Sequence, residues 1–88
     1  MNCELCILDR ITTVYFDNRF LIIMDCDSCL VPMAVWKEHT MEIPEPDEEI
    51  MESLLKLCAR NFYGNQDFFI DKNQRAVPDH LHWHARKK

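Results

Sequence analysis

Residues 80–86 read His80-Leu81-His82-Trp83-His84-Ala85-Arg86, so polar and apolar side chains alternate along this stretch. Successive side chains of a β-strand point to opposite faces. The pattern therefore predicts a strand with its imidazoles and Arg86 on one face and its apolar residues toward the core. An exposed strand face gains no packing from imidazoles. We therefore interpret the gathering of three of the chain's four histidines here as chemical, since imidazole serves as nucleophile, proton carrier and metal ligand.

Four other segments are rich in β-branched and aromatic residues, which is typical of strands. They are 11–16, 19–24, 30–37 and 66–71. The third segment is apolar almost throughout, which predicts a central strand covered on both faces. Pro32 within it speaks against this assignment, because proline cannot donate to a sheet ladder. The pair Asp17-Asn18 is a turn signal between the first two segments.

One helix is predicted, beginning at the acidic segment Glu45-Pro46-Asp47-Glu48-Glu49 and ending at Gly64. The early acids and the later basic residues suit the helix dipole. Its expected apolar stripe consists of Ile50, Leu54, Leu57, Cys58 and Phe62, widened by Met51 and Leu55. Several antiparallel strands and one main packed helix make an α+β fold, and residues 1–88 are expected to form a single domain.

The composition limits the classes of function. The 88 residues carry a net charge of −5 and are 48% hydrophobic, which excludes disordered and collagen-like classes. The acidic charge argues against a nucleic-acid partner, although a single nucleotide needs only a few placed groups. The longest apolar run, Cys29 to Trp36, has eight residues, and the N-terminus has no signal-peptide pattern. We expect a cytoplasmic protein with no membrane partner, and the sequence does not decide between a monomer and a homodimer.

Four of the five cysteines form two Cys-x-x-Cys pairs, namely Cys3, Cys6, Cys26 and Cys29. An odd number of cysteines without a secretory signal speaks against a disulfide framework. In a reducing compartment, the spacing of the two pairs is typical of a four-thiolate zinc site. Cys58 falls on the apolar stripe of the expected helix, so we interpret it as a core residue.

The run from His80 to Ala85 resembles the signature of the histidine-triad (HIT) superfamily, in which three histidines alternate with apolar residues. Arg86 stands where that signature has an apolar residue. Segments 19–25 and 30–35, followed by Lys37-Glu38-His39, resemble the central hairpin of the family and its Pro-Lys-x-His stretch. The opening Cys3-Glu4-Leu5-Cys6 resembles the Cys-x-x-Cys of the zinc-binding members. The resemblance implies a HIT-like antiparallel sheet.

The resemblance also implies nucleotide chemistry through a covalent nucleotidyl-histidine. The middle histidine of the family attacks the α-phosphorus, which makes His82 the expected nucleophile. His84 lies about 6.7 Å further along the strand, where it would touch the phosphate oxygens. We expect the substrate, a nucleotide phosphoanhydride or phosphoramidate, to be bound by Gln74, Arg75 and Arg86. The stretch 72–79 lacks the glycine of the family's phosphate-binding loop. The alternative is therefore a non-catalytic, zinc-stapled module that binds nucleotides or proteins.

A second set of zinc ligands is implied by the resemblance, namely Cys3, Cys6, His39 and His80. Geometry bears on the choice between this set and the four cysteines. If segments 19–24 and 30–37 form a hairpin, Cys26 and Cys29 lie at its tip. His39 then lies about 25 Å away, near the opposite end, and the N-terminal pair of cysteines cannot serve both ends. We expect the Cys₂His₂ set to hold a structural Zn²⁺ ion.

Overall fold

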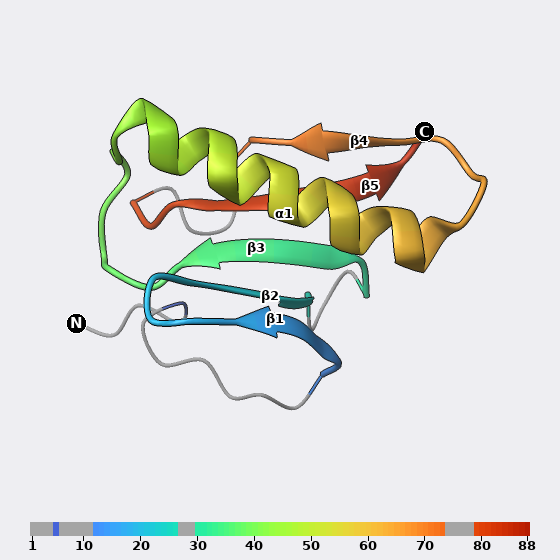
Figure 1. Ribbon diagram of the computed structural model, residues 1–88, viewed down its shortest axis with the longest axis horizontal. Helices are drawn as coiled ribbons and strands as arrows, with labels where there is room; N and C mark the ends of the chain where they lie inside the picture. Colours follow the sequence, from blue (N-terminus) through green and yellow to red (C-terminus); the bar gives the residue numbers. More distant parts are fainter. Residues whose placement is uncertain (1–4, 6–11, 27–29, 74–78) are drawn as a thin grey trace.

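The structure, a computed structural model, describes Leu5 and residues 12–26, 30–73 and 79–88. This part of the chain contains five strands and one helix (Figure 1). In chain order they are β1 (Val14–Asp17), β2 (Leu21–Asp25), β3 (Pro32–Trp36), α1 (Glu45–Tyr63), β4 (Phe68–Asp71) and β5 (His82–Lys87). The strands form one antiparallel sheet in the order β1-β2-β3-β5-β4. The expected α+β fold with one main packed helix is confirmed.

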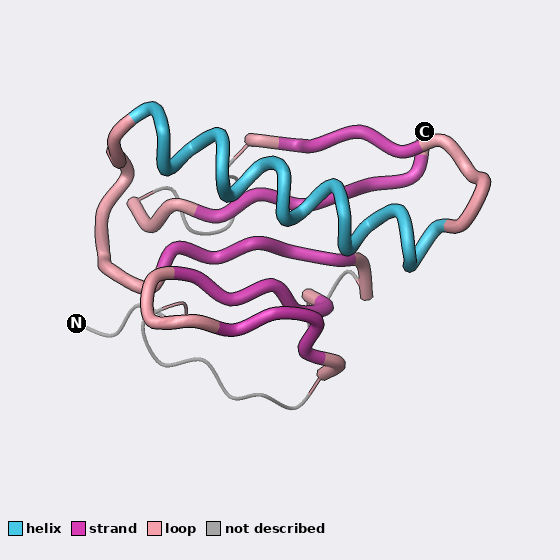
Figure 2. Tube along the Cα trace, viewed as in Figure 1, coloured by secondary structure: helices cyan, strands magenta, loops and turns pink. Residues whose placement is uncertain are grey.

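The sheet separates two clusters of buried side chains. The helix lies across one face of the sheet (Figures 1 and 2) and covers a cluster that includes Trp83, Ala85 and Leu81. The cluster on the other face is made of Leu5, Ile22, Met24, Cys26, Met33 and Val35. We call this second side of the sheet the histidine face, for reasons given below. Nowhere in the described ranges does a helix combine the length and apolar content needed to cross a membrane.

The strand assignments follow from local sequence. β3 is the middle strand of the sheet and all five of its residues are buried, which confirms the expected central strand. Pro32 is tolerated because it is the first residue of β3, a position where proline interrupts no ladder. The turn expected at Asp17-Asn18 is also confirmed. The Asn18 side-chain oxygen accepts hydrogen bonds from the backbone N–H groups of Phe20 and Leu21, at 2.8 and 2.9 Å.

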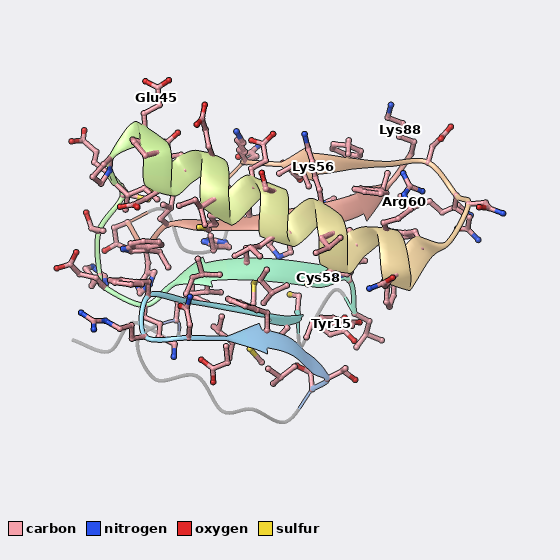
Figure 3. All side chains as sticks on the ribbon, in the orientation of Figure 1. Tyr15, Glu45, Lys56, Cys58, Arg60 and Lys88 are labelled. Carbon is pink, nitrogen blue, oxygen red and sulfur yellow. The ribbon has the colours of Figure 1, made fainter. Side chains whose placement is uncertain are left out.

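The helix begins and ends where the sequence predicts. Pro44 precedes it and another proline lies in its first turn, where the missing N–H removes no intrahelical bond. The acidic first turn is largely exposed, and the Glu45 side chain points away from the sheet (Figure 3). Gly64 ends the helix at a φ of 63°, a left-handed conformation that favours glycine. Its N–H donates to the Arg60 carbonyl at 2.9 Å.

The predicted buried face of the helix was wrong, because the face that packs on the sheet is centred on other residues than expected. The buried residues of α1 are Met51, Leu55, Ala59 and Tyr63, whereas Ile50, Leu57 and Phe62 are 54%, 65% and 43% exposed. Leu54 and Cys58 are partly buried at the edge of the core, as expected for Cys58. The apolar residues of this helix cover an arc wider than one sheet face can bury. The sequence therefore does not indicate which part of the arc meets the sheet.

Replacing Leu55 by alanine is expected to lower the free energy of unfolding by about 2–5 kcal/mol, because Leu55 is fully buried between α1 and the sheet. The matched change at Leu57, a leucine of the same helix that is 65% exposed, is expected to alter it by about 0.5 kcal/mol or less. Urea unfolding followed by circular dichroism measures both variants. Equal losses for the two leucines would contradict this orientation of the helix.

Contacts from α1 and β4 fix the position of β5. The Tyr63 hydroxyl, at the end of α1, donates a hydrogen bond to the Ala85 carbonyl at 2.7 Å. The Lys72 ammonium, just after β4, lies 4.6 Å from the centre of the Trp83 ring and 2.6 Å from the Glu52 carboxylate. β5 is therefore held by hydrogen bonds to β3 and β4 and by side chains from the helix layer.

Candidate functional site

Two histidines of the predicted triad lie on the face of the sheet that α1 does not cover. In the β3–β5 pair, His82 lies opposite Val35 and His84 lies opposite Met33. Both partners belong to the cluster on the far side from the helix. Trp83, between the two histidines, packs under α1. The alternation expected from the sequence is therefore present, and it is the reason for the name histidine face.

The triad is buried rather than exposed. His80, His82 and His84 retain 0%, 3% and 7% of their accessible surface. The sequence-based assumption of an exposed imidazole face is therefore wrong. Apolar neighbours explain part of this burial, since the two β3 side chains opposite these histidines and Leu5 pack on the same face. Buried imidazoles need polar partners, and backbone carbonyls provide them for His80 and His82.

The hydrogen bond made by His82 fixes which of its nitrogens carries the proton. Its Nδ1 lies 2.8 Å from the His80 carbonyl oxygen. A carbonyl only accepts, so Nδ1–H is the donor and the lone pair of the neutral ring lies on Nε2. The ring of His84 is a close neighbour, with a centroid separation of 5.5 Å. This arrangement gives His82 the tautomer of an Nε2 nucleophile.

His80 and His39, 41 residues apart in the chain, lie side by side in space. Their Nδ1 atoms are 3.3 Å apart, and their ring centroids are separated by 5.1 Å. The His80 Nε2–H donates to the Trp36 carbonyl at 2.5 Å, which leaves the lone pair on Nδ1. Burial lowers the pKa of His80 and so favours the neutral ring. His39 Nε2 lies 3.5 Å from a carboxylate oxygen of Asp79.

The His39–His80 pair fits two ligands of a zinc ion. Two nitrogens bound at about 2.0–2.1 Å to a tetrahedral zinc lie about 3.3–3.4 Å apart, and the observed Nδ1–Nδ1 separation is 3.3 Å. The opposite nitrogens face a backbone carbonyl and a carboxylate, which are the usual outer partners of zinc-bound histidines. Within the described ranges, no three metal-binding side chains converge. The other two expected ligands, Cys3 and Cys6, lie outside those ranges.

Of the four cysteines in the alternative zinc site, the structure describes only Cys26. Cys29, like Cys3 and Cys6, lies outside the described ranges. Cys26 is buried just after β2, where its backbone pairs with Val31 and Leu30 to close the expected hairpin. The antiparallel register puts this turn beyond the Asp25–Pro32 pair. His39 follows the other end of β3, beyond Trp36. Cys26 and His39 therefore lie at opposite ends of the hairpin, as expected.

Of the predicted substrate-binding residues, Arg86 is described, while Gln74 and Arg75 lie outside the described ranges. The Arg86 Nε–H donates to Asp71 Oδ2 at 2.8 Å. Asp71 lies opposite His84 in the β4–β5 pair and is 9% exposed. The sequence analysis missed this carboxylate. In the sequence, Asp71 is visible only as an acidic residue at the end of the predicted strand 66–71. Its position there does not indicate which neighbouring strand its side chain will contact.

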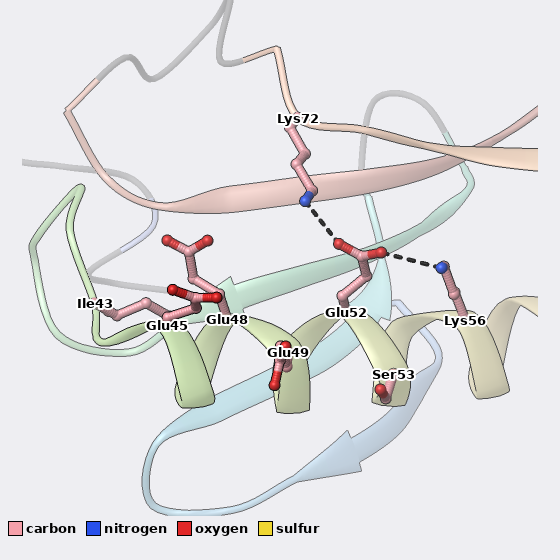
Figure 4. A pocket seen from close by; sticks show the side chains of 8 residues that line it. All are labelled: Ile43, Glu45, Glu48, Glu49, Glu52, Ser53, Lys56 and Lys72. Carbon is pink, nitrogen blue, oxygen red and sulfur yellow. Dashed lines mark ion pairs between the residues drawn. The ribbon is translucent and has the colours of Figure 1, made fainter.

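A hollow beside α1 is a concave feature of the described surface. It is lined mainly by glutamates of the first turns of the helix (Figure 4). Glu52 at its rim pairs with Lys72 at 2.6 Å and with Lys56 at 3.0 Å, and the hydrogen bond from Lys72 is the main cause that lowers the pKa of Glu52. The hollow belongs to the helix layer and lies on the far side of the sheet from His82. Carboxylates and ammonium groups dominate its lining, so it is a charged, solvated surface.

The candidate site is therefore the histidine face around β5, with His82 and His84 beside Asp71 and Arg86 and with the His39–His80 pair at one end. Comparisons with models of known protein families, with curated proteins and with solved structures found no match to this chain.

Proposed function

We propose that this chain is a HIT-type nucleotide hydrolase or nucleotidyl transferase that acts through a covalent nucleotidyl-histidine at His82. The observation that carries the proposal is the hydrogen bond from His82 Nδ1 to the His80 carbonyl at 2.8 Å. It orients the ring, and in the neutral imidazole it leaves the nucleophilic lone pair on Nε2. A second imidazole, that of His84, lies next to His82 on the same face of the strand. A histidine that served only as a core residue would not need this second imidazole.

The proposed reaction has two halves. In the first, His82 Nε2 attacks the α-phosphorus, a nitrogen–phosphorus bond forms, and the leaving group departs with the electron pair of the bond that breaks. In the second, the oxygen of water or of another acceptor attacks the same phosphorus and gives up its proton. The electron pair of the nitrogen–phosphorus bond returns to Nε2. His84 stabilises charge on the phosphate oxygens in both halves, since it stands beside His82 on the same face.

The remaining site residues hold the substrate. Arg86 lies on the same strand face as His84 and carries a permanent positive charge, which suits a phosphorylated ligand. Gln74 and Arg75 belong to the segment that connects β4 to β5, so they are proposed to contact the phosphate or the leaving group. The reaction makes a nucleotide phosphoanhydride or phosphoramidate the preferred substrate class.

We further propose a structural zinc held by Cys3, Cys6, His39 and His80. The support is the 3.3 Å separation of the two Nδ1 atoms, together with the outer partners of both rings. Such an ion contributes folding free energy to a small domain. It would also fix His80, whose carbonyl accepts the hydrogen bond that orients His82. The zinc site would therefore position the nucleophile without taking part in the reaction.

A second candidate function is favoured by one observation, the near-complete burial of His82 and His84 at 3% and 7% exposure. A phosphate must reach His82 Nε2 before it can react, and buried imidazoles restrict that approach. In this case the chain is a non-catalytic, zinc-stapled module that binds a nucleotide or a protein. The two functions differ in whether a covalent intermediate forms.

Trapping the intermediate tests the proposed function. The protein is mixed with a nucleoside 5′-phosphoramidate and with a dinucleoside polyphosphate, and the reaction is quenched at alkaline pH, where phosphohistidine-type bonds survive. Mass spectrometry should find one nucleotidyl group on the peptide that contains His82, and brief acid treatment should remove it. Binding of nucleotide without any adduct would instead identify the non-catalytic module.

A further inference from the structure

The row of side chains on the histidine face becomes more exposed along β5. His80, His82 and His84 are 0%, 3% and 7% exposed, whereas the side chain of Arg86 is 29% exposed. Phe69, on the neighbouring strand β4, is 43% exposed. The Arg86 end of the described row is therefore the end that solvent reaches. A ligand that approaches the imidazoles from solvent meets Arg86 and Phe69 first.

Phe69 and Arg86 stand beside each other on the same face of the sheet. They are directly opposite residues of the antiparallel β4–β5 pair, so their Cβ atoms lie about 4.5–5.5 Å apart. The next pair along, Ile70 and Ala85, contributes to the core under α1. Because side chains alternate between faces, Phe69 and Arg86 point to the opposite side, which is the histidine face.

A carboxylate holds Arg86 in place. Asp71 Oδ2 accepts the hydrogen bond from the Arg86 Nε–H at 2.8 Å, and Asp71 Oδ1 accepts one from the Asn73 backbone N–H at 3.0 Å. The Asp71 side chain is only 10% exposed, so solvent does little to weaken these bonds. The guanidinium is thus preorganised beside an exposed aromatic ring. Flat guanidinium and aromatic groups together make a surface on which nucleobases stack.

We propose that Phe69 and Arg86 form a stacking platform for a planar aromatic group of the ligand, a nucleobase, whose phosphate lies toward His84 and His82. This inference rests on the proposed function, because it assigns the other end of the same ligand. Arg86 lies two residues beyond His84, which is about 6.7 Å along the strand. One sugar between phosphate and base bridges a spacing of this size. The platform would select nucleotides over other phosphate esters.

Two probes test the platform, adenosine 5′-monophosphate and ribose 5-phosphate, which differ by the base. Calorimetric titration of the full chain should show tighter binding of the nucleotide, by about 5- to 150-fold, which is the range for one stacked base. In Phe69→Ala the ratio of the two affinities should fall close to one, and in Phe69→Trp it should be kept. Leu57→Ala, an exposed apolar residue on α1, is the matched control and should keep the ratio.

The outcomes separate this inference from the function on which it rests. An unchanged affinity ratio in Phe69→Ala overturns the platform. If the same variant also changes from a dimer to a monomer in sedimentation, Phe69 lies between two copies of the chain instead. If an adduct forms on His82 equally fast with base-bearing and base-free phosphoramidates, the catalytic proposal holds and the platform fails. If no adduct forms but Phe69→Ala still removes the preference for the nucleotide, the platform holds in a non-catalytic module.

Discussion

Replacing His82 by asparagine is expected to abolish the covalent adduct and to slow turnover of a nucleoside phosphoramidate by at least about 1,000-fold, because the nucleophile is lost. Asparagine is the suitable change at this position. Its amide nitrogen occupies the place of the histidine Nδ1 and keeps a donor for the His80 carbonyl, which His82 now contacts at 2.8 Å. Alanine would remove this donor and leave a cavity at a site that is 3% exposed, so a loss of activity could then reflect a loss of fold.

The matched control is His84→Asn on the same strand face. This variant should still form the adduct on His82, but more slowly by about 10²–10³-fold, because stabilisation of the phosphate oxygens is weakened while the nucleophile remains. Circular dichroism and urea unfolding establish that both variants stay folded. Wild-type turnover by a folded His82→Asn protein would eliminate His82 as the nucleophile, and an adduct found on His84 instead would exchange the two roles.

The elements of the fold were predictable because their signals are local. Alternation over residues 80–86 predicted β5 and assigned its apolar residues to the core, which the burial of Trp83 confirms. The Asn18 turn and the termination of α1 at Gly64 depend on backbone chemistry within a few residues. Each of these features is decided by neighbours in sequence, so no knowledge of strand order was needed.

Features that depend on strand order were not predictable. β5 lies between β3 and β4, and this placement brings Asp71 opposite His84 and Phe69 opposite Arg86. Many pairings of five short strands are compatible with the same alternation. The burial of the imidazoles has the same origin, because it depends on which side chains from other strands pack on their face. The orientation of α1 was missed because its apolar arc is wider than the sheet face.

The contact between His39 and His80 shows how topology joins distant ligands. β3 ends at Trp36 and β5 begins at His82, and the antiparallel pairing of these strands puts the end of one beside the start of the other. The Leu81 N–H donates to the Thr40 carbonyl at 2.8 Å, so the two connecting segments also pair. From the sequence, two ligand sets were open. The position of Cys26 at the far end of the hairpin excludes a site that mixes the two sets, and the 3.3 Å separation of the two Nδ1 atoms supports the set with both histidines.

Removal of zinc is expected to have the largest effect on stability. The purified protein should contain about one zinc per chain, and chelation should lower the free energy of unfolding by several kcal/mol, because metal binding energy becomes folding energy in small domains. Elemental analysis and urea unfolding with and without chelator measure both effects. His39→Ala is the decisive variant, since its side chain is 41% exposed and its removal leaves little cavity, so a loss of stability reports the lost ligand.

Two cysteine variants complete the test of the zinc site. Cys3→Ser should release zinc under either ligand set, whereas Cys26→Ser should keep it, because Cys26 lies at the opposite end of the β2–β3 hairpin from His39. Retention of zinc by both Cys3→Ser and His39→Ala would eliminate the Cys₂His₂ site. Loss of zinc from Cys26→Ser with retention in His39→Ala would assign the ion to the four cysteines. The 3.3 Å contact between His39 and His80 would then be a hydrogen bond between two imidazoles, and the orientation of His82 would not depend on metal.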